Sequence, residues 1–199
     1  MTVVLASQSP RRRELLGQMG FRDFVIRPAV GEEIADPALS PDRLVEELSR
    51  QKCAEVNASC SPDDLVIAAD TVVAIDGTVL GKPRSAQDAF AMLSRLSGRH
   101  HTVYTGVTVA RGGEIRTAHE ATRVHFRPLT HAEIEAYIST GEPMDKAGSY
   151  GIQGYGAMLV EGISGDYFNV VGLPVCLLGR MLAEFDIDTM KLAAEKERN

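Results

Sequence analysis

The chain has 199 residues, of which 44% are hydrophobic, and a formal net charge of −6. Its length and hydrophobic content are typical of one globular domain or of two lobes sharing a core, and we treat residues 1–199 as a single domain. The negative charge argues against a nucleic-acid partner, because such a surface needs an extended basic patch. No apolar run approaches the ~18 residues of a membrane span and the N-terminus lacks a secretory signal, so we expect a cytoplasmic protein with no membrane partner.

Strand-like and helix-like segments alternate through the first half of the chain. This alternation predicts an α/β fold with a parallel or mixed sheet. Residues 3–6 form an apolar strand, after which Ser9 is the expected N-cap of a helix and Pro10 its first residue. A second strand is expected at residues 24–28, and an acidic loop over residues 31–37 precedes a helix that begins at Ser40-Pro41.

The longest apolar run predicts a central strand at residues 65–75. It meets Asp76-Gly77, a strong signal for a two-residue hairpin, and returns as residues 78–80. A helix over residues 85–98 follows, with Ser85 as its N-cap and Gly98 at its C-terminal end.

The second half of the chain predicts antiparallel pairing. Residues 101–110 and 117–126 form a hairpin in this prediction, and Thr130 with Glu133 is a capping box for a helix that ends near Gly141. The sheet is therefore expected to contain an antiparallel portion.

The segment between Gly141 and Gly172 holds eight of the eighteen glycines, interleaved with polar side chains. That density is unusual for a connecting loop, and we expect the segment to wrap around a ligand. A final apolar helix through Leu182 and a charged tail over residues 191–199 complete the chain.

Cysteine and histidine do not indicate a metal site. The cysteines are three in number and lack a Cys-x-x-Cys spacing, so we expect them to be reduced, with Cys176 buried. The five histidines contain no His-Glu-x-x-His motif, and we do not interpret them as ligands.

An arginine run stands in the first turn of the first predicted helix, where cations are unfavourable. Arg11, Arg12 and Arg13 follow the hydroxyls of Ser7 and Ser9 at this helix start. A multiply charged phosphate would suit such an arrangement. The ordinary alternative is a solvated basic turn.

Asp70 is the only charged residue within residues 65–75. A carboxylate there is costly unless it is paired, hydrogen-bonded or bound to a metal, although a strand-end position or a buried ion pair would also explain it. Continuing the predicted hairpin register sets Thr71 opposite Lys82. This supports proximity of Lys82 to Asp70 but not its orientation, and an exposed lysine is the alternative.

Two further residues complete the candidate site. Lys52 continues the apolar stripe of its predicted helix, so it either extends its ammonium group to solvent or points into a cleft and neutralises phosphate. Glu33 lies in the acidic loop and could hold a hard divalent cation together with Asp70, unless it is a solvated loop acid. Together these residues describe a site for a metal-bound polyphosphate.

Four motifs carry a family resemblance: Ser-Gln-Ser-Pro-Arg-Arg at residues 7–12, Ala-Asp-Thr-Val-Val at 69–73, Gly-Lys-Pro at 81–83, and the run from Glu142 to Gly154. With them the chain resembles the Maf proteins, nucleoside triphosphate pyrophosphatases, over essentially its whole length. The resemblance implies a mixed twisted sheet flanked by helices, with two lobes around a nucleotide cleft as in the inosine triphosphate pyrophosphatases.

The resemblance also implies hydrolysis of a nucleoside triphosphate to the monophosphate and pyrophosphate, with Mg or Mn as cofactor. The pattern Asp70-Thr71 with Gly-Ile-Gln-Gly at residues 151–154 is similar to the branch that acts on dTTP and UTP rather than on 7-methyl-GTP. A homodimer is a further family-level expectation. Alternatives are a pyrophosphatase for deaminated purine or modified pyrimidine nucleotides, and a nucleotide-binding regulator of cell division.

The resemblance implies individual roles. Asp70 would be the proton acceptor, although from sequence it is either a general base or a metal ligand, and either Glu32 or Glu33 would be the second acid. The implied specificity positions are Arg11, Thr71 and Gln153. The implied phosphate and metal positions are Arg12, Glu33, Lys52 and Lys82, and further substrate contacts are expected from Ser7, Ser9 and Lys146. Arg13 lies outside the motif and is expected to be peripheral.

Overall fold

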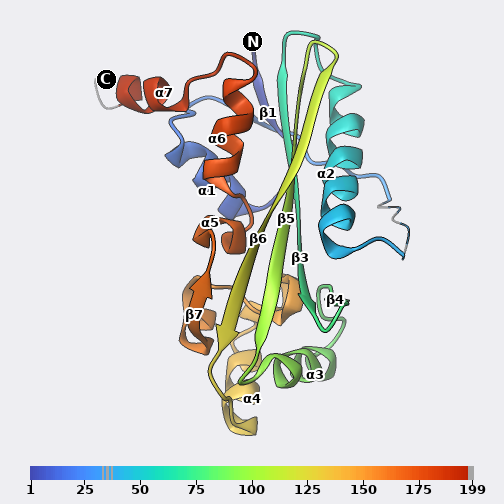
Figure 1. Cartoon of the computed structure of the whole chain (residues 1–199), viewed down its shortest axis with the longest axis vertical. Coiled ribbons are helices and arrows are strands. Elements are labelled where there is room, and N and C mark those ends of the chain that lie inside the picture. Colours follow the sequence, from blue (N-terminus) through green and yellow to red (C-terminus); the bar gives the residue numbers. More distant parts are fainter. Residues whose placement is uncertain (33, 35, 37, 197–199) are drawn as a thin grey trace.

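The computed structural model describes residues 1–32, 34, 36 and 38–196 as an elongated molecule built on one twisted sheet (Figure 1). Its strands are β1 (Val3–Leu5), β2 (Val25–Ile26), β3 (Leu65–Ile75), β4 (Thr78–Leu80), β5 (His100–Arg111), β6 (Glu114–Phe126) and β7 (Val160–Ser164). Its helices are α1 (Pro10–Gln18), α2 (Pro41–Asn57), α3 (Ala86–Leu96), α4 (His131–Ser139), α5 (Tyr167–Val171), α6 (Val175–Ala183) and α7 (Thr189–Lys196). Short 3-10 turns occupy Glu142–Asp145, Ala147–Ser149 and Gly154–Leu159.

The sheet is mixed, as predicted. Its strand order is β2-β1-β3-β5-β6-β7, and β4 pairs with β3 outside this path. β1 pairs in parallel with β2 and β3, whereas the β3–β5, β5–β6 and β6–β7 pairs are antiparallel. The long hairpin of β5 and β6 runs through most of the length of the molecule (Figure 1).

Local signals in the sequence set the element boundaries. Ser9 caps α1 by accepting a hydrogen bond from the N–H of Arg12, with Pro10 in the first turn, and the capping box of Thr130 and Glu133 is formed at α4. Gly77 occupies the left-handed region at φ 71° in the turn between β3 and β4. These predictions are confirmed.

The predicted partner of Thr71 is wrong. The β3–β4 ladder begins at Ile75–Thr78 as expected but ends at the Val73–Leu80 pair. Thr71 instead pairs with Thr105 of β5. Lys82 therefore lies beyond the strand, where the alternation of the ladder does not determine its direction.

Alternation along β3 separates two packed layers. One face contacts α2, and its cluster contains Val66 and Ala68 together with Cys53 and Val56 of the helix. The other face, with Ile67 and its neighbours, packs against α1 and α6. Asp70 continues the first face, so the alternation of the strand directs it toward α2.

A further apolar cluster forms the other end of the molecule. Phe126 and Tyr150 are buried there, with residues of β3, β5, α3 and α4 around them. Because this cluster and the α1–α6 cluster occupy different stretches of the same sheet, the molecule has two lobes (Figure 1).

The expected burial of Cys176 is wrong. Cys176 is exposed, whereas Cys53 is buried, because α6 buries a face made of Leu178, Met181 and Leu182. The glycine-rich segment contains the strand β7 as well as three 3-10 turns.

Among the described residues, no helix is both long enough and apolar enough to span a bilayer.

Candidate functional site

A pocket of about 1000 Å³ lies where the β1–α1 turn, the middle of β3, α2 and the glycine-rich segment meet. It is lined by ten predicted site residues: Ser7, Ser9, Arg11, Arg12, Lys52, Asp70, Thr71, Lys82, Lys146 and Gln153. Glu32, the alternative second acid, is exposed and does not line it. The prediction for Glu33 falls outside the described residues. Positions spread over most of the sequence are thus brought together.

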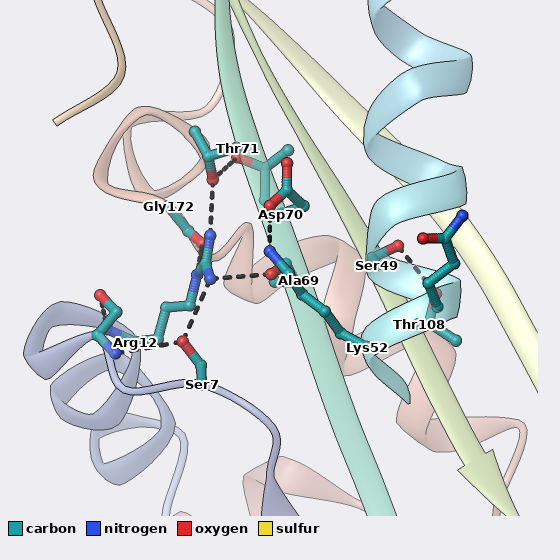
Figure 2. A network of polar contacts seen from close by, with 12 residues as sticks. Ser7, Arg12, Ser49, Lys52, Ala69, Asp70, Thr71, Thr108 and Gly172 are labelled. Atoms are coloured by element: carbon teal, nitrogen blue, oxygen red, sulfur yellow. Dashed lines mark hydrogen bonds and ion pairs between the residues drawn. The ribbon is translucent and has the colours of Figure 1, made fainter. Parts of the chain in front are cut away.

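Arg12 is held inside a network of protein acceptors (Figure 2). Its Nε donates to the carbonyl oxygen of Gly172 at 2.8 Å, and its Nη1 donates to the carbonyl oxygen of Ala69 at 2.8 Å and to Ser7 Oγ at 3.2 Å. Its Nη2 donates to Thr71 Oγ1 at 3.0 Å. One guanidinium therefore joins the β1–α1 turn, β3 and the end of α5.

Thr71 extends this network through the sheet. Its hydroxyl lies 2.9 Å from that of Thr105, which donates to the backbone carbonyl oxygen of Asn169 in α5 at 3.0 Å. Thr71 can donate to Thr105 while it accepts from Arg12, so the chain of bonds is consistent in direction. The side chain of Thr71, a predicted specificity position, is therefore fixed by its neighbours.

Asp70 and Lys52 form an ion pair at the pocket wall (Figure 2). Lys52 reaches Asp70 Oδ1 from α2, and their side chains are 17% and 12% exposed. The pair offsets the cost of placing a carboxylate in an apolar strand. Lys52 thus points into the cleft, and the buried ion pair considered for Asp70 is also present.

Arg11 and Lys82 differ from the other cations of the pocket. Neither makes a hydrogen bond or ion pair with any residue in the described part of the chain. At longer range the charge of Arg11 acts on Asp145. Both side chains are therefore available to an anionic ligand.

Two side chains to which the sequence assigned no role lie next to the Gln153 segment: Glu142, which lines the pocket, and Tyr137, which contacts Glu142 and Gly151. The Tyr137 hydroxyl donates to Glu142 Oε1 at 2.8 Å, and Lys146 Nζ donates to the Glu142 carbonyl oxygen at 2.6 Å. Glu142 lies inside the motif run, where the sequence indicates only an acidic residue in a loop. Its hydrogen-bond partners are known only from the fold. Gln153 itself is exposed and makes no side-chain hydrogen bond to a described residue.

The chemistry of the donor set suits a cation that is shared with phosphate. Among the described residues no group of three His, Cys, Asp or Glu side chains could hold a metal ion. Asp70 is one hard oxygen donor on the pocket wall. Mg²⁺ is commonly bound by one or two carboxylates together with substrate phosphates and water, so the residues present fit such an ion.

Comparison with known proteins agrees with the geometry. The model of the family described as Maf-like protein matches residues 2–185. The chain belongs to this family. It is 52% identical to a protein of Symbiobacterium thermophilum over 92% of this chain and 93% of the relative, and 53% identical to one of Moorella thermoacetica over 94% and 96%. Both relatives are named dTTP/UTP pyrophosphatase.

Solved structures of other proteins show weaker likeness. The Ham1 protein of Staphylococcus aureus has a TM-score of 0.47 and 14% identity, over 63% of this chain and 72% of that one. A dITP/XTP pyrophosphatase of Mycobacterium abscessus has a TM-score of 0.45 and 14% identity, over 93% and 98%.

Proposed function

We propose that this Maf-family chain hydrolyses nucleoside triphosphates, dTTP and UTP foremost, to the monophosphate and pyrophosphate with the help of a divalent cation. The observation that carries the proposal is that residues from all four motifs line one pocket. The names of the relatives at about 50% identity support the choice of dTTP and UTP.

The main charge for the triphosphate comes from the two cationic side chains of the pocket that make no hydrogen bond or ion pair with the described part of the chain. Arg11, at the start of α1, and Lys82, after β4, supply charge for the phosphates, and a helix N-terminus adds N–H donors at the same place. Ser7, Ser9 and Lys146 add donors along the same wall. Arg12 contributes to the phosphate site indirectly, because its guanidinium holds the β1–α1 turn in place.

Asp70 acts on the α-phosphorus end of the substrate, as general base toward the attacking water or as metal ligand. A divalent cation held by Asp70 and Glu33 would offset phosphate charge and lower the pKa of a bound water. Lys52 holds the Asp70 carboxylate in place through their ion pair. The Lys52 ammonium lies at the pocket wall beside this carboxylate. From there it also offsets negative charge that develops on the reacting phosphate.

The base is recognised by Gln153, whose amide offers both a donor and an acceptor to a pyrimidine edge. Thr71 and Arg11 are the other specificity positions. Thr71 is fixed through Arg12 and Thr105, so its position is defined before a nucleotide arrives.

The decisive experiment incubates the purified chain with natural and modified nucleoside triphosphates and Mg²⁺ or Mn²⁺, and measures pyrophosphate separately from phosphate. We expect pyrophosphate from dTTP and UTP at the highest kcat/KM. Preference for dITP or XTP would favour the house-cleaning alternative, and tight binding without product would favour a nucleotide-binding regulator. Release of phosphate alone would contradict the proposal.

Location and assembly remain predictions. The cytoplasmic location follows from the sequence expectation, and the homodimer from the family resemblance. Fractionation of cells and sedimentation of the purified chain test them.

A further inference from the structure

The loop over residues 151–156, which we call the 151–156 loop, is held from outside by one carboxylate. The N–H groups of Tyr155 and Gly156 donate to Glu142 at 2.9 and 3.0 Å, the first to Oε2 and the second to Oε1. Bonds of this kind to an ionised acceptor are stronger than bonds between neutral groups. Glu142 therefore fixes the end of the loop that follows Gln153.

Tyr137 of α4 fixes the other end. Its hydroxyl accepts a hydrogen bond from the N–H of Gly151 at 3.3 Å and donates to Glu142 Oε1 at 2.8 Å. The two ends of the loop are thus connected through one phenol and one carboxylate. Burial raises the pKa of Tyr137, so the hydroxyl keeps its proton and remains a donor to Glu142.

Close packing leaves the loop little room to shift. A Cβ on Gly154, which has φ +65°, would lie 2.5 Å from Glu142 Oε2, and one on Gly156 would lie 2.1 Å from the carbonyl oxygen of Gly151. Ile152 is 8% exposed within the apolar cluster of α1 and α6. Gln153, between these anchors, is exposed toward the pocket. The backbone is fixed while the amide remains available.

Glu142 is ionised in this setting. Burial by itself raises the pKa of Glu142, but the bonds from Gly156, Tyr155 and Tyr137 and the charge of Lys146 outweigh it, and the pKa is lowered. The same ammonium donates to the Glu142 carbonyl oxygen. The charged acceptor is therefore stabilised by the loop that it holds.

We propose that Glu142 is a positioning residue for nucleotide selectivity: with Tyr137 it clamps the 151–156 loop and so sets where the Gln153 amide meets the base. The inference rests on the proposed function, in which Gln153 contacts the base. Glu142 contacts no reacting group in this proposal, and its effect passes through Gln153.

The test is a double-mutant cycle of Glu142→Gln and Gln153→Ala, read as kcat/KM for dTTP divided by kcat/KM for dCTP. In Glu142→Gln an NH₂ donor takes the place of one of the two oxygen acceptors. That donor then faces a backbone N–H of the loop, with which it cannot form a hydrogen bond. We expect each single variant to lower the ratio about tenfold, mainly through KM for dTTP, and the double variant to lose no more than Gln153→Ala alone.

Glu133→Gln is the matched control. Glu133 also accepts a backbone hydrogen bond, from the N–H of Thr130 at 2.8 Å, but it does so in the capping box at the start of α4 and does not line the pocket. We expect this variant to change stability and to leave the selectivity ratio within about twofold of the parent.

Amide hydrogen exchange provides a readout that does not need activity. In Glu142→Gln the N–H groups of Tyr155 and Gly156 should exchange at least tenfold faster, with β3 unchanged. Unchanged exchange, an equal loss for both nucleotides, or multiplicative effects in the double variant would each overturn the clamp.

Failure of the proposed function is recognised separately. If no nucleotide yields pyrophosphate, equilibrium affinities for dTTP and dCTP replace kcat/KM in the same cycle and decide the clamp. If Gln153→Ala leaves the preference intact, base reading by Gln153 is wrong and the clamp proposal falls with it, whatever the exchange rates show.

Discussion

The cationic side chains of the pocket differ in what they already contact. Arg12, Lys52 and Lys146 each bind protein acceptors, whereas Arg11 and Lys82 make no hydrogen bond or ion pair with the described part of the chain. Binding a triphosphate through the second pair breaks no internal contact. The first three also keep the pocket in shape.

Replacement of Arg12 tests this division. Arg12→Lys cannot reproduce four donor contacts from one planar fork, so carbonyl oxygens of Ala69 and Gly172 lose their bonds. We expect the free energy of unfolding to fall by about 2–4 kcal/mol, measured by urea denaturation. The exposed Arg13 serves as control, since Arg13→Lys should stay within about 0.5 kcal/mol. Equal stability of the two variants would show that the network contributes little.

Replacement of Asp70 tests the chemistry. Asp70→Asn keeps an oxygen for Lys52 but removes the negative charge, so pyrophosphate release should fall by roughly 10²–10⁴-fold with the fold retained by circular dichroism. Partial recovery at high Mg²⁺ would assign a metal-ligand role, and none would favour a general base. Asp76→Asn, in an exposed ion pair with Arg99, is the control. Unchanged turnover in Asp70→Asn would remove Asp70 from the mechanism.

Sequence reasoning reached the site residues that violate a local rule. Asp70 in an apolar strand and Lys52 in an apolar stripe are anomalies that need no coordinates. The bonds of Arg12 could not be predicted, because Ala69 and Gly172 lie far away in the sequence and act through backbone oxygens, which any residue carries. The role of Glu142 was hidden for the same reason, since two of its partners are backbone N–H groups.

At the scale of elements, α2 lies unusually close to β5. A Cβ on Gly106 would stand 2.1 Å from the carbonyl oxygen of Val45, so the helix sits directly on the strand. This contact sets the distance from Lys52 on α2 to Asp70 on the neighbouring strand β3. Glycine is required here by close approach of backbone rather than by a turn.

Gly106→Ala should therefore push the helix away from the sheet. We expect a loss of about 3 kcal/mol in the free energy of unfolding or failure to fold, because overpacking against backbone cannot relax through side-chain motion. Thermal denaturation measures the loss. Gly162→Ala in β7 is the matched control, since nothing lies within 4 Å of its added Cβ. Similar melting temperatures for both variants would contradict the tight contact.

Elements with local start and stop signals were predictable, and elements that depend on distant partners were not. Serine, threonine and proline mark the starts of α1, α3 and α4, and Asp76-Gly77 marks the hairpin, because these signals act within a few residues. β7 was missed since its glycine and serine carry no strand signal and its pairing comes from β6. The bounds of β4 were predicted correctly, but the pairing of Thr71 with Lys82 was wrong because a ladder continues only while both backbones stay extended, and this one ends at Val73 and Leu80.

At the scale of the whole molecule, the pocket lies where the two lobes meet. It is lined by Ile152 and Val171 from the apolar cluster of α1 and α6, and by Val73 and Tyr150 from the cluster at the other end. Tyr150 is also hydrogen-bonded to buried His101, their Oη and Nε2 atoms lying 2.7 Å apart. The packing that forms the pocket wall therefore includes a titratable group.

This buried histidine predicts how the stability of the whole chain depends on pH. Burial, followed by the charge of His100, lowers the pKa of His101 from 6.5 to about 4. Below pH 6.5 the unfolded chain takes up a proton that the folded chain does not, so the stability is complete above this pH and declines as the pH falls toward 4. Between pH 7 and pH 5 we expect the free energy of unfolding to fall by about 2 kcal/mol.

Urea denaturation at pH 7 and pH 5 measures this fall. The double replacement His101→Phe and Tyr150→Phe removes both hydrogen-bonding groups while it keeps aromatic rings against Phe126, which both native rings contact edge to face. The double variant should lose most of the difference between the two pH values. His131→Phe, on the exposed start of α4, should keep it. If His131→Phe flattens the dependence as much as the double variant does, the pH dependence does not originate at His101.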